Sequence, residues 1–114
     1  MTTVTLSVAS RDEVTRRALA AFEGHRQGAH ISLASVELLL QTMTRARWEL
    51  LKVMTGQGAV SIRKVARRLG RDLKSVQGDV HALLDVGILN RTDDGRILFP
   101  FDAVHVDFML TAAT

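Results

Sequence analysis

The chain has 114 residues, an apolar fraction of 46%, a net charge of +3 and no cysteine. This length suits one domain, with or without an added dimerisation segment, and the missing cysteine excludes disulfides, thiolate metal ligands and a cysteine nucleophile. No apolar run could span a bilayer and no secretory signal is recognisable, so we expect a soluble, cytoplasmic protein with acidic partners, nucleic acid first.

The first third of the chain predicts a strand, a helix and a second strand. Residues 2–8 alternate between apolar and hydroxyl side chains, which is typical of a half-buried strand. Ser10 and Glu13 form a capping box at the start of a helix that runs to about Arg26. A short strand over about 30–34 follows. This part of the chain carries no recognisable chemistry.

Four further helices are predicted from capping residues that precede helical apolar patterns. The side chains of Ser35, Thr44, Ser61 and Asp72 can each accept a hydrogen bond from a free amide of a first helical turn. Glycines then end the helices, as Gly70 does after barely two turns. The apolar stripes are Val36, Leu38, Leu39 and Leu40; Ala46, Trp48, Leu50, Leu51 and Met54; Ile62, Val65, Ala66 and Leu69; and Leu73, Val76, Val80, Leu83 and Leu84.

The last two of these helices are joined by about three residues, 70–72, which makes a helix-turn-helix. Beyond them, an Asp-Asp-Gly turn at 93–95 separates the short runs 88–92 and 96–99. This indicates a β-hairpin, because the turn requires positive φ. A hairpin directly after the second helix would be a wing. Alternating apolar residues over 104–110 predict either a further strand or an extended arm.

The excess positive charge of the chain lies in one window, residues 61–74. Removing its six basic residues and one acid from the 15 basic and 12 acidic residues of the chain leaves nine bases against eleven acids. In a helix, like charges four residues apart, as at Arg63 and Arg67, cost roughly 0.2–0.5 kcal/mol per pair. Such a cost favours a nearby polyanion, and a solvated helix face is the alternative. The basic residues are Arg63, Lys64, Arg67, Arg68, Arg71 and Lys74.

From Trp48 to about Val106 the chain resembles winged helix-turn-helix transcriptional regulators of the MarR-like kind, small prokaryotic DNA-binding proteins. The match is carried by SIRKVARRLGRDLKSVQGDVHALLDVGIL, in which a short helix, a Gly-Arg-Asp turn and a long second helix lead into the hairpin. We expect an α+β, mainly helical fold with a winged helix-turn-helix at 44–100. Residues 1–43 would be a strand-helix extension for dimerisation or partner binding, and 101–114 a C-terminal arm. Since relatives are often encoded beside toxin-like proteins, the resemblance implies an autorepressor that could also be an antitoxin.

In this motif the second helix enters the major groove and the preceding helix rests over the phosphate backbone. Ordinary surface polarity is the alternative for Ser75 and Gln77. Gly78, which costs roughly 1 kcal/mol in a helix interior, would serve either close approach to DNA or tight helix packing. The predicted contacts are Arg63, Lys64, Arg67 and Arg71 to phosphate; Lys74, Ser75, Gln77, Gly78 and His81 to bases; and Arg91 and Arg96 at the wing, with Arg68 unassigned.

The pattern offers no catalytic constellation, so we expect a protein that is not an enzyme and needs no cofactor. Its four histidines are scattered without ligand spacing, which argues against a metal site. We expect double-stranded DNA and a second copy of the chain as partners, and no membrane. Surplus apolar residues over 4–8, 36–43 and 104–110 could form the dimer interface. The alternative is a protein-interaction module that neutralises a cognate toxin, with DNA binding secondary.

Overall fold

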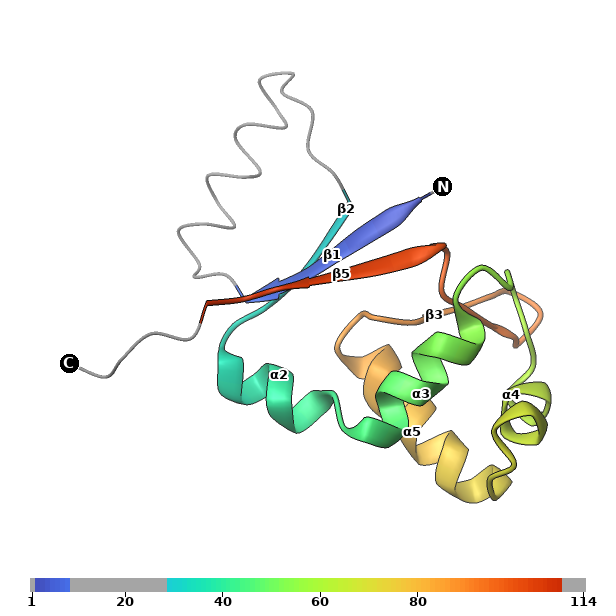
Figure 1. Ribbon diagram of the computed structural model, residues 1–114. Coiled ribbons are helices and arrows are strands. Elements are labelled where there is room, and N and C mark those ends of the chain that lie inside the picture. The colour runs from blue at the N-terminus through green and yellow to red at the C-terminus, as the bar shows by residue number, and fades with distance from the viewer. Residues whose placement is uncertain (1, 9–28, 110–114) are drawn as a thin grey trace.

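The computed structural model describes residues 2–8 and 29–109. Within these ranges it is a small α+β unit with four helices and a three-stranded parallel sheet, so the coarse fold class is confirmed. In chain order the elements are β1 (Thr3–Val8), β2 (Ala29–Leu33), α2 (Val36–Thr42), α3 (Arg45–Met54), α4 (Ile62–Leu69), α5 (Leu73–Asp85), β3 (Asn90–Arg91), β4 (Ile97–Leu98) and β5 (Ala103–Asp107) (Figure 1).

The sheet has the order β2-β1-β5, and both neighbours run parallel to β1. The segment after the hairpin is therefore a strand and not an extended arm, at least as far as Asp107. Thr2 and Asp102 join the starts of β1 and β5. The amide and hydroxyl of Thr2 donate to one Asp102 carboxylate oxygen at 3.0 and 3.1 Å. In return, the amides of Asp102 and Ala103 donate to the Thr2 carbonyl at 2.8 and 3.1 Å.

The predicted caps are confirmed in the four described helices. Ser35, Thr44, Ser61 and Asp72 each accept a hydrogen bond from the amide three residues further on. Gly70 ends α4 in the left-handed region, with φ of 64°, which a residue with a Cβ rarely adopts. The helix predicted from Ser10, together with its glycine stop, lies outside the described residues. Local capping chemistry thus determines where the described helices begin.

The predicted hairpin is present as the antiparallel pair β3 and β4. A third short segment joins it, because Val60 and Ile97 exchange amide-to-carbonyl hydrogen bonds of 2.9 and 2.8 Å. This bridge ties the hairpin to the residues directly before α4. Sequence analysis did not predict it, since one paired residue leaves no alternating pattern to detect.

One hydrophobic cluster runs through the described residues, from Val4 and Leu6 of β1 to Ile97 and Phe99 at the hairpin. Trp48 is half-buried against this core, as expected. Some positions depart from the sequence patterns: Ser7, on the hydroxyl side of β1, is buried, whereas Leu40 on α2 is exposed. Val106 and Phe108, on the predicted apolar side of the last strand, are exposed as well. No helix within the described ranges is long and apolar enough to cross a membrane.

Candidate functional site

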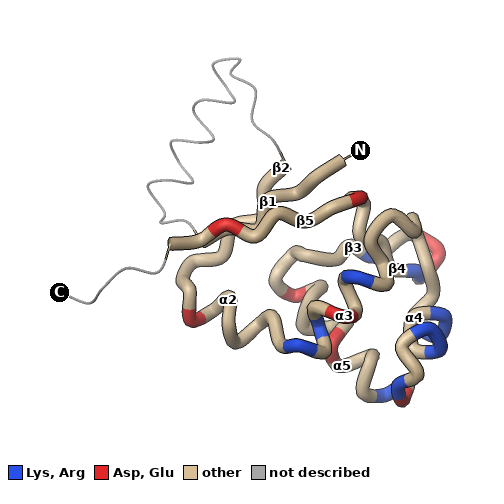
Figure 2. The backbone as a smooth tube through the Cα atoms, viewed as in Figure 1, with Lys and Arg blue, Asp and Glu red and all other residues tan. Residues whose placement is uncertain are grey.

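α4 carries a row of exposed cations above a buried apolar face. Within this short helix, Val65 and Ala66 are buried, whereas Arg63, Lys64 and Arg67 are exposed. Figure 2 shows the resulting concentration of basic residues on α4. Within the described part of the chain, no hydrogen bond or ion pair engages the side chains of these three residues. They are therefore available to an anionic partner.

Arg68, which sequence analysis left unassigned, is also exposed but has a partner. Its guanidinium donates to the side-chain carbonyl of Gln57 at 3.1 Å, in the loop between α3 and α4. Arg67 and Arg68 both lie in the last turn of α4, where positive charge is favourable because the helix dipole is negative there. The stability of α4 thus explains in part why positive charges stand at these two positions. It does not account for Arg63 and Lys64 in the first turn.

An open hollow with a volume of about 260 Å³ lies where α4 meets the start of α5. Arg63, Arg67 and Arg71 line it together with Ala66 and Leu73. Arg63 and Arg67 have no side-chain partner among the described residues and favour an anion there, since a recess in low-dielectric material concentrates the field of the charges that line it.

The outward face of α5 is polar and open. Its apolar residues Val76, Val80 and Leu83 are buried, as the helical projection predicts. Among the described residues, a Cβ added at Gly78 would meet no heavy atom within 4 Å outside its own stretch of helix, so packing against them does not account for this glycine. The predicted base-reading residues are all exposed: Lys74, Ser75, Gln77, Gly78 and His81.

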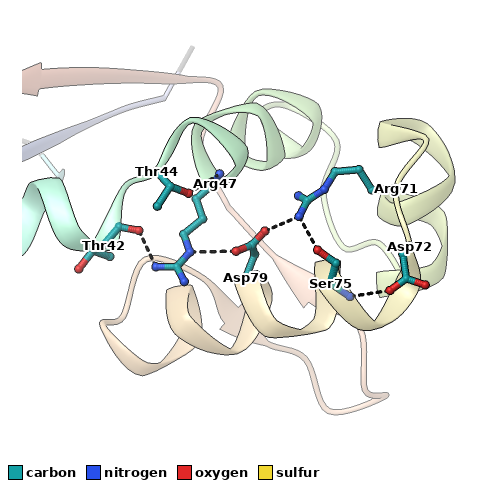
Figure 3. Close-up of polar contacts among 7 residues, drawn as sticks. All are labelled: Thr42, Thr44, Arg47, Arg71, Asp72, Ser75 and Asp79. Carbon is teal, nitrogen blue, oxygen red and sulfur yellow. Dashed lines mark hydrogen bonds and ion pairs between the residues drawn. The ribbon is translucent and has the colours of Figure 1, made fainter.

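Arg71 is held differently from the other predicted phosphate residues (Figure 3). Its Nη2 atom donates to Oδ2 of Asp79 and to Oγ of Ser75, both at 2.8 Å. The other Asp79 oxygen accepts from Nε of Arg47 at 3.0 Å, and Nη1 of Arg47 donates to the Thr42 carbonyl at 2.8 Å. The side chains of Arg47, Asp79 and Arg71 are only 22%, 15% and 27% exposed.

Sequence analysis missed Arg47 and Asp79, which lie 32 residues apart in the chain. One local signal was present: Arg71, Ser75 and Asp79 follow one another at intervals of four, the spacing of side chains on one face of a helix. This spacing places Ser75 and Asp79 on one face of α5, and Arg71, in the turn before α5, contacts both. The contact with Arg47 depends on how α3 lies against α5 and has no local signal.

At the hairpin, Arg91 on β3 and Arg96 after the turn are both exposed, but the side chain of Arg96 is hydrogen-bonded to neighbouring residues. Nε of Arg96 donates to Asp94 at 2.8 Å, and Nη1 of Arg96 donates to the carbonyl of Ala59 at 3.4 Å. The hydroxyl of Thr92 also donates to Asp94, and this bond is the main cause that lowers the pKa of the Asp94 carboxyl. Asp94 thus neutralises part of the charge that Arg96 brings to the hairpin.

Potential metal ligands do not gather in the described residues. No group of three or more His, Asp or Glu side chains there could hold a metal ion. His30, His81 and His105 belong to β2, α5 and β5, while His25 lies outside the described ranges.

The fold and site define a small α+β protein with an exposed basic helix beside a polar, glycine-containing helix face. The chain belongs to the HVO_A0114 family, whose model matches residues 42–106. That match runs from the end of α2 through the basic helix and the hairpin into β5, and leaves out β1 and β2. No curated protein and no solved structure matches the chain.

Proposed function

We propose that the protein is a sequence-specific, double-stranded DNA-binding transcriptional regulator with a winged helix-turn-helix of the MarR-like kind. α3, α4 and α5 would be its three helices, and the β3–β4 hairpin its wing. The order of these elements supports this assignment, as does the Val60–Ile97 bridge, which attaches the hairpin to the start of α4. The α4–α5 pair would be the helix-turn-helix, with α5 as the helix that enters the major groove.

The observation that carries the proposal is the shared surface of α4 and α5. Arg63, Lys64 and Arg67 have no internal partner in the described residues and would contact phosphates, which position the protein without reading sequence. Lys74 would donate to guanine O6 and N7, and exposed Ser75, Gln77, Gly78 and His81 would face the same groove. Arg91, and Arg96 if it leaves Asp94, would contact the minor groove or backbone from the wing.

The apolar surface at the other end of the molecule favours a protein partner as well. Leu40 is 64% exposed, Phe108 41% and Met109 80%, and α2 and the C-terminal end of β5 lie away from α4 (Figure 1). We assign this end to a second copy of the chain, since two-fold dimers are the usual way in which such regulators gain affinity and spacing selectivity. The protein would act in the cytoplasm as a repressor of its own operon.

The second candidate function is that of an antitoxin, in which the same apolar end binds a cognate toxin protein. Both functions can coexist in one molecule, because the apolar end and the basic helix are different surfaces. Copurification with the product of a neighbouring gene that survives removal of the α4 cations would favour this candidate. Release of that product by the same variant would assign partner binding to the basic surface instead.

DNA binding by fluorescence anisotropy, over a series of salt concentrations, tests the first proposal. Replacing Arg63 and Arg67 together by Ala should weaken all duplexes about equally. It should also reduce the slope of log affinity against log salt by roughly 2 per protomer, since each phosphate contact contributes about 0.9. Lys74→Ala should instead reduce the preference for selected over mixed-sequence DNA.

Arg45→Ala is the matched control for Arg67→Ala alone, because each removes one exposed positive charge and Arg45 lies on α3, outside the α4–α5 surface. It should change affinity and slope little. Duplex binding that is unaltered in the Arg63/Arg67 variant would contradict the assignment of the α4 surface. Absence of duplex binding by the unaltered protein would contradict the function itself.

A further inference from the structure

The Nη2 and Nη1 atoms of Arg71 are both turned into the protein. Both N–H groups of its Nη2 atom have an acceptor, one in Ser75 and one in Asp79. Its Nη1 atom is buried and has no hydrogen-bond partner in the part of the chain that the structure describes. In this conformation neither terminal nitrogen of Arg71 can donate to a phosphate at the surface, in contrast to Arg63 and Arg67 beside it.

We propose that Asp79 is a positioning residue of the DNA-reading surface, which holds Arg71 inward so that Arg71 orients Ser75 and α5 and does not bind phosphate. This inference rests on the proposed DNA-binding function and changes the role that sequence analysis gave to Arg71. It also adds Asp79 and Arg47, neither of which was a predicted site residue, to the machinery of recognition.

Ser75 acquires a defined hydrogen-bonding role in this arrangement. Its Oγ atom accepts from the charged Arg71 guanidinium, and its amide is already used by the Asp72 cap at 3.0 Å. The hydroxyl hydrogen of Ser75 is then free to donate outward. Ser75 would therefore read an acceptor on DNA, such as N7 or O6 of guanine, N7 of adenine or O4 of thymine.

Asp79 also determines how α5 lies against the rest of the helices. Through Arg47 it connects α5 to α3, and through the bond of Arg47 to the Thr42 carbonyl it connects α5 to the end of α2. Removing the carboxylate would leave two guanidinium groups facing each other without the charge that separates them. Their repulsion would release Arg71 and alter the angle at which α5 enters the groove.

Salt dependence and sequence preference together distinguish a phosphate contact from a positioning contact. The probes are a mixed-sequence duplex and a preferred duplex selected from random-sequence DNA with the unaltered protein. Arg67→Ala should reduce the salt slope by about 1 per protomer and leave the ratio of preferred to mixed-sequence affinity unchanged. Arg71→Ala should leave the slope unchanged and reduce that ratio about tenfold, the effect of losing one charge-assisted hydrogen bond.

Two further substitutions test whether Arg71 acts through its guanidinium geometry and whether Asp79 holds it in place. Arg71→Lys keeps the charge but cannot bridge Ser75 and Asp79 as a guanidinium does, so the ratio of preferred to mixed-sequence affinity should fall as in Arg71→Ala. The matched Arg45→Lys, on α3 and outside the α4–α5 surface, should keep both slope and ratio. Asp79→Asn should reduce the ratio of preferred to mixed-sequence affinity about tenfold. Affinity for the mixed-sequence duplex itself should be kept or should rise, because a negative charge is lost and Arg71 is released.

Thermal unfolding of each variant accompanies the binding measurements. A merely structural role for Asp79 would lower stability and weaken both duplexes in parallel, with the ratio unchanged, and that result would overturn the inference. A salt slope that falls in Arg71→Ala as much as in Arg67→Ala would also overturn it, while the proposed function would stand. If the unaltered protein binds neither duplex, the proposed function fails and this inference fails with it.

Discussion

Gly78 stands in the middle of α5, on a face that is exposed. Glycine in a helix interior is less favourable than alanine by roughly 1 kcal/mol, because the unfolded chain loses more backbone freedom. Within the described residues no neighbour would obstruct a Cβ at this position. The space that glycine leaves is therefore open to a partner outside the chain, which favours close approach to DNA over the packing alternative.

The variant Gly78→Ala should separate stability from binding. We expect the free energy of unfolding to rise by about 0.5–1 kcal/mol, since alanine restricts the unfolded chain and meets no clash in the folded one. DNA affinity should fall, because the added methyl group holds the helix away from the groove. Urea unfolding and duplex titration measure the two effects. Tighter duplex binding together with higher stability would contradict close approach at Gly78.

At the scale of elements, β1 and β5 are joined by a contact between residues 100 positions apart. The amide of Thr2, and secondarily its hydroxyl, hold the pKa of the Asp102 carboxyl below its ordinary value. A group whose pKa is lower in the folded than in the unfolded state binds fewer protons when folded. Its contribution to stability is complete above the ordinary aspartate pKa and is lost as the pH falls through the folded pKa.

We therefore expect Asp102→Asn to destabilise the protein at neutral pH and to differ less from the unaltered protein as the pH is lowered below the ordinary aspartate range. Urea unfolding of both proteins at neutral and acidic pH measures this difference. Asp107→Asn, on the same strand, controls for the loss of an exposed acid. The pKa of the Asp94 carboxyl is also lowered. Asp94 is present in the unaltered protein and in both variants, so it does not contribute to the difference in stability between them. A difference in the free energy of unfolding between the two proteins that grows towards acidic pH would contradict a stabilising role for the Thr2–Asp102 contact.

Across the whole molecule, two surfaces of opposite character are separated. The basic α4 and the hairpin lie at one end, while α2 and the C-terminal end of β5 lie at the other (Figures 1 and 2). Exposed Leu40 belongs to α2, and exposed Phe108 and Met109 directly follow β5. Dimerisation through the apolar end would leave the basic α4 helix of each protomer exposed to solvent, as binding to two DNA half-sites would require. The two surfaces can then be altered independently.

Light scattering tests this arrangement. We expect a dimer at micromolar concentration, and Leu40→Lys should shift it towards monomer because a charge would be buried in the interface. Asn90→Lys, the same change of charge at an exposed hairpin residue, should leave the dimer intact. A monomeric unaltered protein would contradict the dimer.

In a dimer whose wing residues Arg91 and Arg96 are replaced by Ala, the salt slope would measure the number of phosphate contacts made by α4 and the turn before α5. Three contacts per protomer, from Arg63, Lys64 and Arg67, would give a slope near −5, whereas four would give one near −7, at about 0.9 per contact. A slope near −5 would support the inward position of Arg71. A slope near −7 would return Arg71 to the phosphate set that sequence analysis assigned.

The amino-acid sequence by itself determined the features that depend on neighbours within a turn or two. Each cap was predictable because the capping side chain and the amide that it accepts from are three residues apart, as at Ser61 and Lys64. The Asp-Asp-Gly turn predicted the hairpin for the same reason, and the basic cluster was visible as local charge. In all these cases the physical cause lies within the segment that shows it.

Only the tertiary structure decided the contacts between distant segments. The order β2-β1-β5 arises because the segment after the hairpin returns to the first strand. The inward position of Arg71 arises because α5 brings Asp79 beside it and α3 brings Arg47 to the same carboxylate. Sequence spacing places a side chain on a face but cannot show what another element brings to that face. Of four similar cations, three therefore have no side-chain partner within residues 2–8 and 29–109, and one is held inward.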